Sequence, residues 1–138
     1  MKVKMEEKPV EIKQVSEREI WVGEHRLYLG EDNIFYITVV GEVDGKTAAE
    51  VTEIDNKFKS MVEGKINVLA DLNKGGKQSV EARKIWKKMT EGDRTGKIAM
   101  YGMHPVARVL ASFVMGVSRK KDMRFFKTKE EALAWLKK

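Results

Sequence analysis

Cysteine is absent from the 138 residues of this chain, and histidine and proline each occur only twice. The lack of cysteine excludes disulfides, thiol catalysis and every cysteine-based zinc or iron–sulfur site. No run approaches the roughly 20 apolar residues that a membrane span needs. Residues 1–13 also lack the apolar core that a signal peptide carries. We therefore expect a cytoplasmic protein that does not span a membrane.

Charge is divided unevenly between the two halves of the chain. The composition is 42% hydrophobic and 35% charged, which is typical of one soluble globular domain. Residues 1–69 carry 10 Lys and Arg against 14 Asp and Glu, whereas residues 70–138 carry 17 against 7. The basic half could face an anionic partner, but lysines on solvent-facing helices explain it more simply. Because no nucleic-acid motif is present, we do not expect nucleic-acid binding.

The first part of the chain predicts an antiparallel hairpin behind a charged leader. We expect residues 1–22 to be partly ordered, with one short strand near residues 10–15. Strands are predicted at residues 26–29 and 34–40, because β-branched and aromatic residues fill them and turn-forming residues 30–33 separate them. The second strand is almost wholly apolar, so it should lie centrally in the sheet with both faces covered.

A helix is predicted from Gly45 to Val62, with Asp44 as its N-cap. Apolar residues recur along it at helical spacing and should face the core. Its charged residues, including Asp55 and Lys59, should lie on the surface. The residues expected to face the core are Ala48, Val51, Ile54, Phe58, Met61 and Val62.

The remainder alternates strands with helices, and helix starts are marked by Ser79, Pro105 and Thr128 with Glu131. The predicted order is β-β-α-β-α-β-α-β-α, in a single domain over residues 23–138. The expected fold class is α/β, with a mixed, mostly parallel five-stranded sheet, an N-terminal hairpin and about four helices. The remaining predicted strands are 66–72, 98–101 and 123–126, and residues 73–78 are expected to form a loop.

A candidate site follows from this architecture, because ligands of open α/β sheets gather outside the carboxyl ends of the strands. Helix starts and a basic side chain there would suit a phosphate or carboxylate group. The residues expected at this edge are Asp71, Asn73, Lys74, Gly75, Gly76, Ser79, Gly102, His104 and Arg108.

Several of these residues also have ordinary structural roles as an explanation. His104 followed by proline is an ordinary helix start, and Ser79 is a good N-cap. Asp71 could cap a helix or pair with Lys74. Gly75 and its neighbour Gly76 lie near a helix, but the phosphate-loop pattern is absent. No catalytic set or metal-ligand spacing is present, so we expect no catalytic residue, metal or cofactor, and an enzyme is not the favoured interpretation.

Several segments resemble the SpoIIAA-like group of STAS domains, the sulfate-transporter and anti-sigma-factor-antagonist domains. They are the hairpin Leu27–Val40, the strand Asn67–Leu72 before the helix at Ser79, the segment Lys97–Gly102, and the ending Arg124–Leu136. The resemblance is greatest to stand-alone domains without assigned function. It implies a binding module rather than an enzyme.

In regulatory STAS domains a serine at the start of the second helix is phosphorylated, within an Asp-Ser-Ser/Thr-Gly signature. The segment here is Lys77-Gln78-Ser79-Val80, so Ser79 matches while the flanking Asp and Gly are missing. The resemblance therefore implies a regulatory module that binds a protein partner, with Ser79 as the candidate phosphorylation site.

An alternative is a carrier or sensor of a small anionic or lipid-like ligand. His104 and Arg108 would hold the anionic head group, and the resemblance adds the related fold of lipid-binding CRAL-TRIO domains. The outer strand of the N-terminal hairpin is also a possible open edge, through which a homodimer could form.

Overall fold

The structure is a computed structural model that describes residues 10–102 and 122–138. The helix expected from Pro105 lies outside these residues, as do the site candidates His104 and Arg108. Within the described part, no helix has the length and hydropathy of a membrane span.

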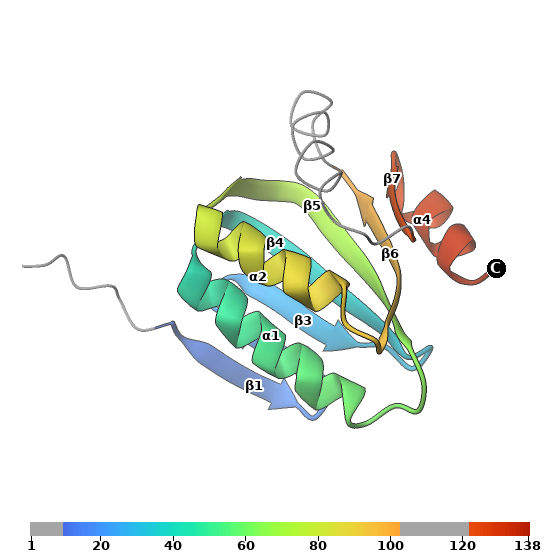
Figure 1. Ribbon diagram of the computed structural model, residues 1–138, viewed down its shortest axis with the longest axis horizontal. Helices are drawn as coiled ribbons and strands as arrows, with labels where there is room; N and C mark the ends of the chain where they lie inside the picture. The colour runs from blue at the N-terminus through green and yellow to red at the C-terminus, as the bar shows by residue number, and fades with distance from the viewer. Residues whose placement is uncertain (1–9, 103–121) are drawn as a thin grey trace, which may run out of the picture.

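One mixed seven-stranded sheet organises the described chain (Figure 1). Its strands follow one another in chain order from β1 to β7. The first four pair antiparallel, and β4 to β7 pair parallel. The strands are β1 (Ile12–Ser16), β2 (Glu19–Val22), β3 (His25–Leu29), β4 (Ile34–Val43), β5 (Ile66–Gln78), β6 (Thr95–Tyr101) and β7 (Met123–Phe126).

Helices cover both faces of the sheet unequally. Figure 1 looks onto the face covered by α1 (Gly45–Lys59) and α2 (Val80–Thr90), while α4 (Lys129–Leu136) lies at the end of the sheet near β7. The main core lies under α1, where alternate residues of β4 and β5 face inward. A smaller core forms on the opposite face, where Ala132 and Leu136 of α4 pack against Leu69 and Ala99. The described fold therefore has a central sheet between two layers of helix.

The expected five-stranded, mostly parallel sheet is wrong, because β1 and β2 add two antiparallel strands within the charged segment before residue 23. The strand β1 matches the short strand expected near residues 10–15, whereas β2 was not expected. Ile20 and Val22 are buried, and they alternate with half-buried Glu19 and Trp21. The alternating pattern of β2 is only four residues long and lies in a highly charged segment, so the sequence did not predict this strand. The predicted hairpin of β3 and β4 is confirmed. The outer face of β4 is less covered than expected, since Tyr36, Thr38 and Val40 are half-buried.

The loop expected after Leu72 is also wrong, because β5 continues through Gln78. Its polar second half pairs with an equally extended β4, with Lys74 opposite Val40 and Gly75 opposite Gly41. A Cβ on Gly76 would lie 2.9 Å from the carbonyl carbon of Gly41, so glycine permits this close approach. Backbone pairing, rather than side-chain burial, therefore extends this strand.

The predicted N-caps are confirmed at three helices. Asp44, Ser79 and Thr128 each accept a hydrogen bond from the backbone N–H three residues ahead. Each cap satisfies one of the helix N–H groups that have no partner within the helix. The starts of α1, α2 and α4 are therefore set by local sequence.

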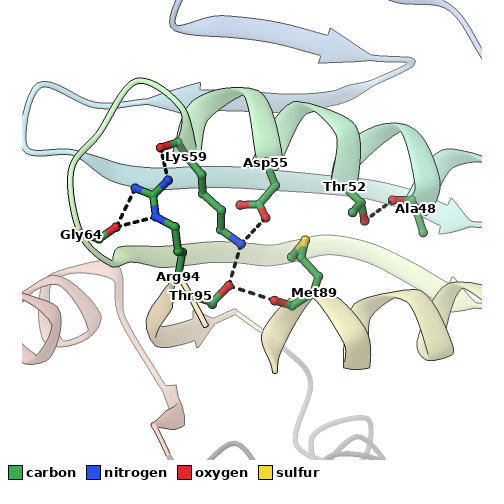
Figure 2. Close-up of polar contacts among 8 residues, drawn as sticks. All are labelled: Ala48, Thr52, Asp55, Lys59, Gly64, Met89, Arg94 and Thr95. Carbon is green, nitrogen blue, oxygen red and sulfur yellow. Dashed lines mark hydrogen bonds and ion pairs between the residues drawn. The ribbon is translucent and has the colours of Figure 1, made fainter. Parts of the chain in front are cut away.

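The expected surface position of Asp55 and Lys59 is wrong. Asp55 is 1% exposed and Lys59 is 9% exposed, and Asp55 Oδ2 lies 2.7 Å from Lys59 Nζ. Lys59 Nζ also donates to Thr95 Oγ1, which in turn donates to the Met89 carbonyl (Figure 2). This network connects α1 to the end of α2 and the start of β6.

Candidate functional site

Part of the predicted site forms where β5 and β6 lie side by side. Asp71 is the register partner of Tyr101. Asp71 Oδ1 accepts hydrogen bonds from the backbone N–H of Asn73 at 3.0 Å and from its side-chain Nδ2 at 2.9 Å. Gly102 has φ +86°, and a Cβ there would lie 2.5 Å from Asn73 Cγ. Asp71, Asn73 and Gly102 are therefore brought together as expected.

Tyr101 belongs to this group, although it is not among the predicted site residues. Burial raises the pKa of its phenol to about 12, and the charges of Asp71 and Glu130 add to the effect. The phenol therefore remains protonated at neutral pH and can donate a hydrogen bond. The sequence could have predicted this position. Tyr101 is the last residue of its strand, and Asp71 ends the apolar run of the neighbouring strand.

The other described candidates lie elsewhere. Lys74, Gly75 and Gly76 continue along β5, away from Asp71, and are exposed. At about 3.3 Å per residue, eight strand positions separate Asp71 from Ser79 by on the order of 25 Å. The candidates within the described residues are therefore not gathered into one site. The extension of β5 divides the described candidates into a group around Asp71 and a group around Ser79.

Ser79 lies at the point where β5 becomes α2. Its backbone N–H donates to the Val43 carbonyl at 3.0 Å, and its Oγ accepts from the Ala82 N–H at 3.0 Å. The side chain is half-buried, whereas its neighbours Lys77 and Val80 are exposed. A hydroxyl at this position faces the N-terminal end of a helix, where backbone N–H groups favour an anion.

The start of α1 lies beside this corner. A Cβ on Gly45 would lie 2.7 Å from Glu81 Cβ, so α1 and α2 approach closely at their N-termini. Trp86 Nε1 donates to Gln78 Oε1 at 2.7 Å and holds α2 against the end of β5. We call the corner formed by residues 77–80 and the first turn of α2 the Ser79 corner.

Basic side chains project from α2 beyond the Ser79 corner. Four cations of this helix are exposed, against one exposed carboxylate within it. The cations are Arg83, Lys84, Lys87 and Lys88, and the carboxylate is Glu81. This surface has a positive charge that would attract an acidic partner.

The described group around Asp71 does not suit an anion by itself. It contributes a carboxylate, an amide and a phenol, while the cationic candidate Arg108 lies outside the described residues. Among residues 10–102 and 122–138, no three His, Asp or Glu side chains lie together in a way that could hold a metal ion.

Comparisons with known proteins agree with this architecture. The family model described as SpoIIAA-like matches residues 34–137. A solved structure of an uncharacterized protein of the DUF3478 family with a SpoIIAA-like fold, from Shewanella loihica, superposes with a TM-score of 0.63. The two chains are 17% identical, and the match covers 81% of this chain and 91% of the other.

The anti-sigma factor antagonist SpoIIAA, solved in its unphosphorylated form, has a similar fold. It superposes with a TM-score of 0.57 at 14% identity, over 82% of this chain and 97% of SpoIIAA. No curated protein matches the sequence. The fold is therefore that of an α/β SpoIIAA-like module. Because the family match spans most of the sequence, the chain belongs to the SpoIIAA-like family.

Proposed function

We propose that this chain is a regulatory interaction module that binds a protein partner at the Ser79 corner, and that phosphorylation of Ser79 controls the binding. The main observation that supports this proposal is the position of Ser79. Its half-buried hydroxyl caps α2, and its neighbours Lys77 and Val80 are exposed. A partner can reach these neighbours without rearrangement of the sheet. The solved relative described as unphosphorylated supports a phosphorylated counterpart in the same fold.

A phosphate on Ser79 would be compatible with the fold. It would lie at the N-terminus of α2, where the backbone N–H groups and the helix dipole favour negative charge. Lys77 lies two residues before Ser79, and Arg83 lies four residues after it. Phosphorylation would therefore change the charge of the corner while leaving α2 folded, which is what a binding switch requires.

The experiment compares Ser79→Asp with the matched variant Thr128→Asp. Both replace a helix N-cap by another good N-cap that carries a negative charge. Intact-mass analysis of protein from its own host should show a fraction with one phosphate at Ser79. Partners captured by the wild-type protein should bind Ser79→Asp with an affinity changed about tenfold, equivalent to about 1.4 kcal/mol, and Thr128→Asp unchanged.

Two results would overturn the proposal. One is an equal affinity of every captured partner for wild-type protein, Ser79→Asp and Ser79→Ala. The other is an equal change in affinity from Thr128→Asp, which would place the effect outside the Ser79 corner. Unfolding curves of the same variants would separate a lost cap from a lost contact, because Ser79→Ala should cost about 1 kcal/mol and Ser79→Asp little.

The small-ligand alternative depends on His104 and Arg108, and no described contact favours it. Native mass spectrometry of freshly purified protein would detect a carried molecule as an additional mass that denaturation removes. Such a mass, together with lower occupancy in Arg108→Ala, would replace the partner-binding proposal.

A further inference from the structure

The strand β1 leaves one edge of the sheet open. It pairs with β2 on one side, and no other strand of the described chain pairs with it. All five of its residues are exposed, and Ile12 and Val15 retain 48% and 54% exposure. An edge strand with exposed apolar side chains is a template for pairing with another strand.

The hydrogen bonds to β2 determine which residues of β1 face outward. The Gly23 N–H donates to the Glu11 carbonyl at 2.7 Å, and these residues lie directly opposite one another in the β1–β2 register. Hydrogen-bonded and non-bonded pairs alternate along antiparallel strands. The pair Ile12 and Val22 is therefore non-bonded, so the N–H and C=O groups of Ile12, and likewise of Gln14, point to the open edge.

A groove of about 530 Å³ lies beside this edge, between β1 and α1. Its apolar part is formed by Ile12, Ile20 and Ile54, and Gln14 and Lys57 contribute to its polar part. Figure 1 shows α1 alongside β1, which is the strand at the edge of the sheet. Because Ile12 lies opposite the buried Val22, its side chain is on the α1 face and extends the main core toward the open edge.

Charge and the regular part of β1, before the irregularity between Gln14 and Ser16, together select one self-pairing register for this strand. In a pair of two β1 strands, a residue whose N–H and C=O groups point to the open edge must lie opposite another such residue. The two-fold axis of the pair therefore passes through a residue position, not between two positions. An axis at Lys13 places two Lys13 side chains opposite each other, and an axis at Gln14 or Val15 would require pairing across the irregularity between Gln14 and Ser16. An axis at Ile12 places Lys13 opposite Glu11 twice. Opposite charges stabilise such cross-strand pairs, and like charges destabilise them.

We propose that a second copy of this chain docks antiparallel on β1 in the Ile12-centred register. The two Ile12 side chains then lie opposite each other on the α1 face and cover the apolar part of each groove. Two Lys13–Glu11 pairs flank the axis on the opposite face. The irregular register between Gln14 and Ser16 limits pairing to the first half of the strand, so the interface is small and dimerisation depends on concentration.

Charge reversal tests the register by sedimentation velocity over a range of protein concentrations. Lys13→Glu and Glu11→Lys each turn two attractive pairs into two repulsive ones, and each should raise the dimer Kd about tenfold, since each cross-strand pair changes by up to about 1 kcal/mol. The double variant Glu11→Lys with Lys13→Glu should restore the wild-type Kd. All substitutions are on exposed side chains, so folding is preserved.

Disulfide crosslinking of introduced cysteines is a second test of the register. No native cysteine can form a competing disulfide, because the chain has none. Opposed residues of a hydrogen-bonded pair have Cα atoms about 5.5 Å apart, which a disulfide can span. Ile12→Cys should therefore crosslink under mild oxidation about ten times faster than the control Val15→Cys. Val15 is similarly exposed on the same strand but lies far from the axis.

Three outcomes would overturn the proposal. They are a monomer at every concentration, a dimer Kd unaffected by the single charge reversals or not restored by the double variant, and equal crosslinking of Ile12→Cys and Val15→Cys. None of these outcomes bears on Ser79, because β1 and the Ser79 corner belong to different parts of the sheet.

Discussion

Asp55 and Lys59 lie one turn apart on α1 and form an ion pair of 2.7 Å that is almost completely buried. Burial raises the pKa of the Asp55 carboxyl, and the neighbouring Lys59 opposes this shift. Lys59 Nζ has a second partner in Thr95 Oγ1, whereas Asp55 Oδ1 is buried with no hydrogen-bond partner among the described residues. Asp55 therefore depends on Lys59 for its stability as an anion inside the fold.

Lys59→Met should lower the free energy of unfolding by about 3 kcal/mol, because it leaves the Asp55 charge buried without a partner. Urea denaturation measures the loss. The loss should be smaller at pH 5 than at pH 8, since protonation of Asp55 removes the unpaired charge. Lys57→Met is the matched control on the same helix, and its exposed side chain predicts a change within about 0.5 kcal/mol. Equal effects of both substitutions would contradict the prediction.

Arg94 holds the C-terminal end of α1. Its guanidinium donates to the carbonyl of Lys59, the last residue of α1, and to the carbonyls of Val62 and Gly64 in the segment that follows the helix. Arg94→Ala should cost about 3 kcal/mol of unfolding free energy.

The variant Arg94→Lys separates geometry from charge. It keeps the positive charge but cannot serve three carbonyls with a planar fork, so its stability should lie between those of the wild type and Arg94→Ala. Hydrogen exchange over residues 60–65 should accelerate in the same order. If Arg94→Lys equals the wild type, charge alone explains the role of this residue.

His25 should make stability depend on pH below neutrality. Its buried Nδ1 accepts from the Val40 N–H, and burial lowers its pKa from the model-peptide value of 6.5, against the opposing charges of Glu24 and Asp44. Just below pH 6.5 the unfolded chain binds a proton that the folded protein does not, so stability falls as pH falls. The contribution of neutral His25 is complete above pH 6.5.

Urea midpoints at pH 7.5 and pH 5.5 test this dependence. A single group changes stability by at most about 1.4 kcal/mol per pH unit. His25→Leu should be less stable than the wild type at pH 7.5, because the Val40 N–H loses its acceptor, yet it should lose less on acidification. His104 is present in both proteins, so the difference between them belongs to His25. Parallel pH profiles would show that His25 is not responsible.

Gly102→Ala should destabilise the protein by about 2 kcal/mol. Its φ of +86° is unfavourable for alanine, and the added Cβ would meet Asn73 at 2.5 Å. Adding Asn73→Ala should recover the part of the loss that comes from the contact. Gly75→Ala is the control, because its nearest contact is 3.4 Å and its φ is not positive. Thermal unfolding compares the variants, and an equal effect at both glycines would contradict the prediction.

Local signals predicted much of this fold. The N-cap side chains of Asp44, Ser79 and Thr128 occupy their predicted positions. Most of the apolar face of α1 was also anticipated, since Val51 and Phe58 are buried, but α1 ends at Lys59 rather than Val62, and Met61 is exposed. These features depend on residues within one or two turns of one another, so the sequence displays them directly.

Features that depend on distant partners could not be predicted in this way. Lys59 resembles any surface lysine until the Thr95 hydroxyl from β6 is brought to it. The polar half of β5 lacks an apolar pattern, because pairing with β4 rather than burial defines it. The same extension of β5 separated Ser79 from Asp71, so one predicted site became two groups.

The strictly sequential strand order has a consequence for synthesis of the protein. Each strand pairs with the strand made just before it, so no described strand has to insert between two that have already paired. The antiparallel pairs from β1 to β4 join near neighbours in the chain and close with little loss of entropy, whereas each parallel pair from β4 to β7 forms only after its crossover segment has been made. The sheet can therefore grow at one side as the chain leaves the ribosome, and β1, which keeps an open edge, is the first of the described strands to be made.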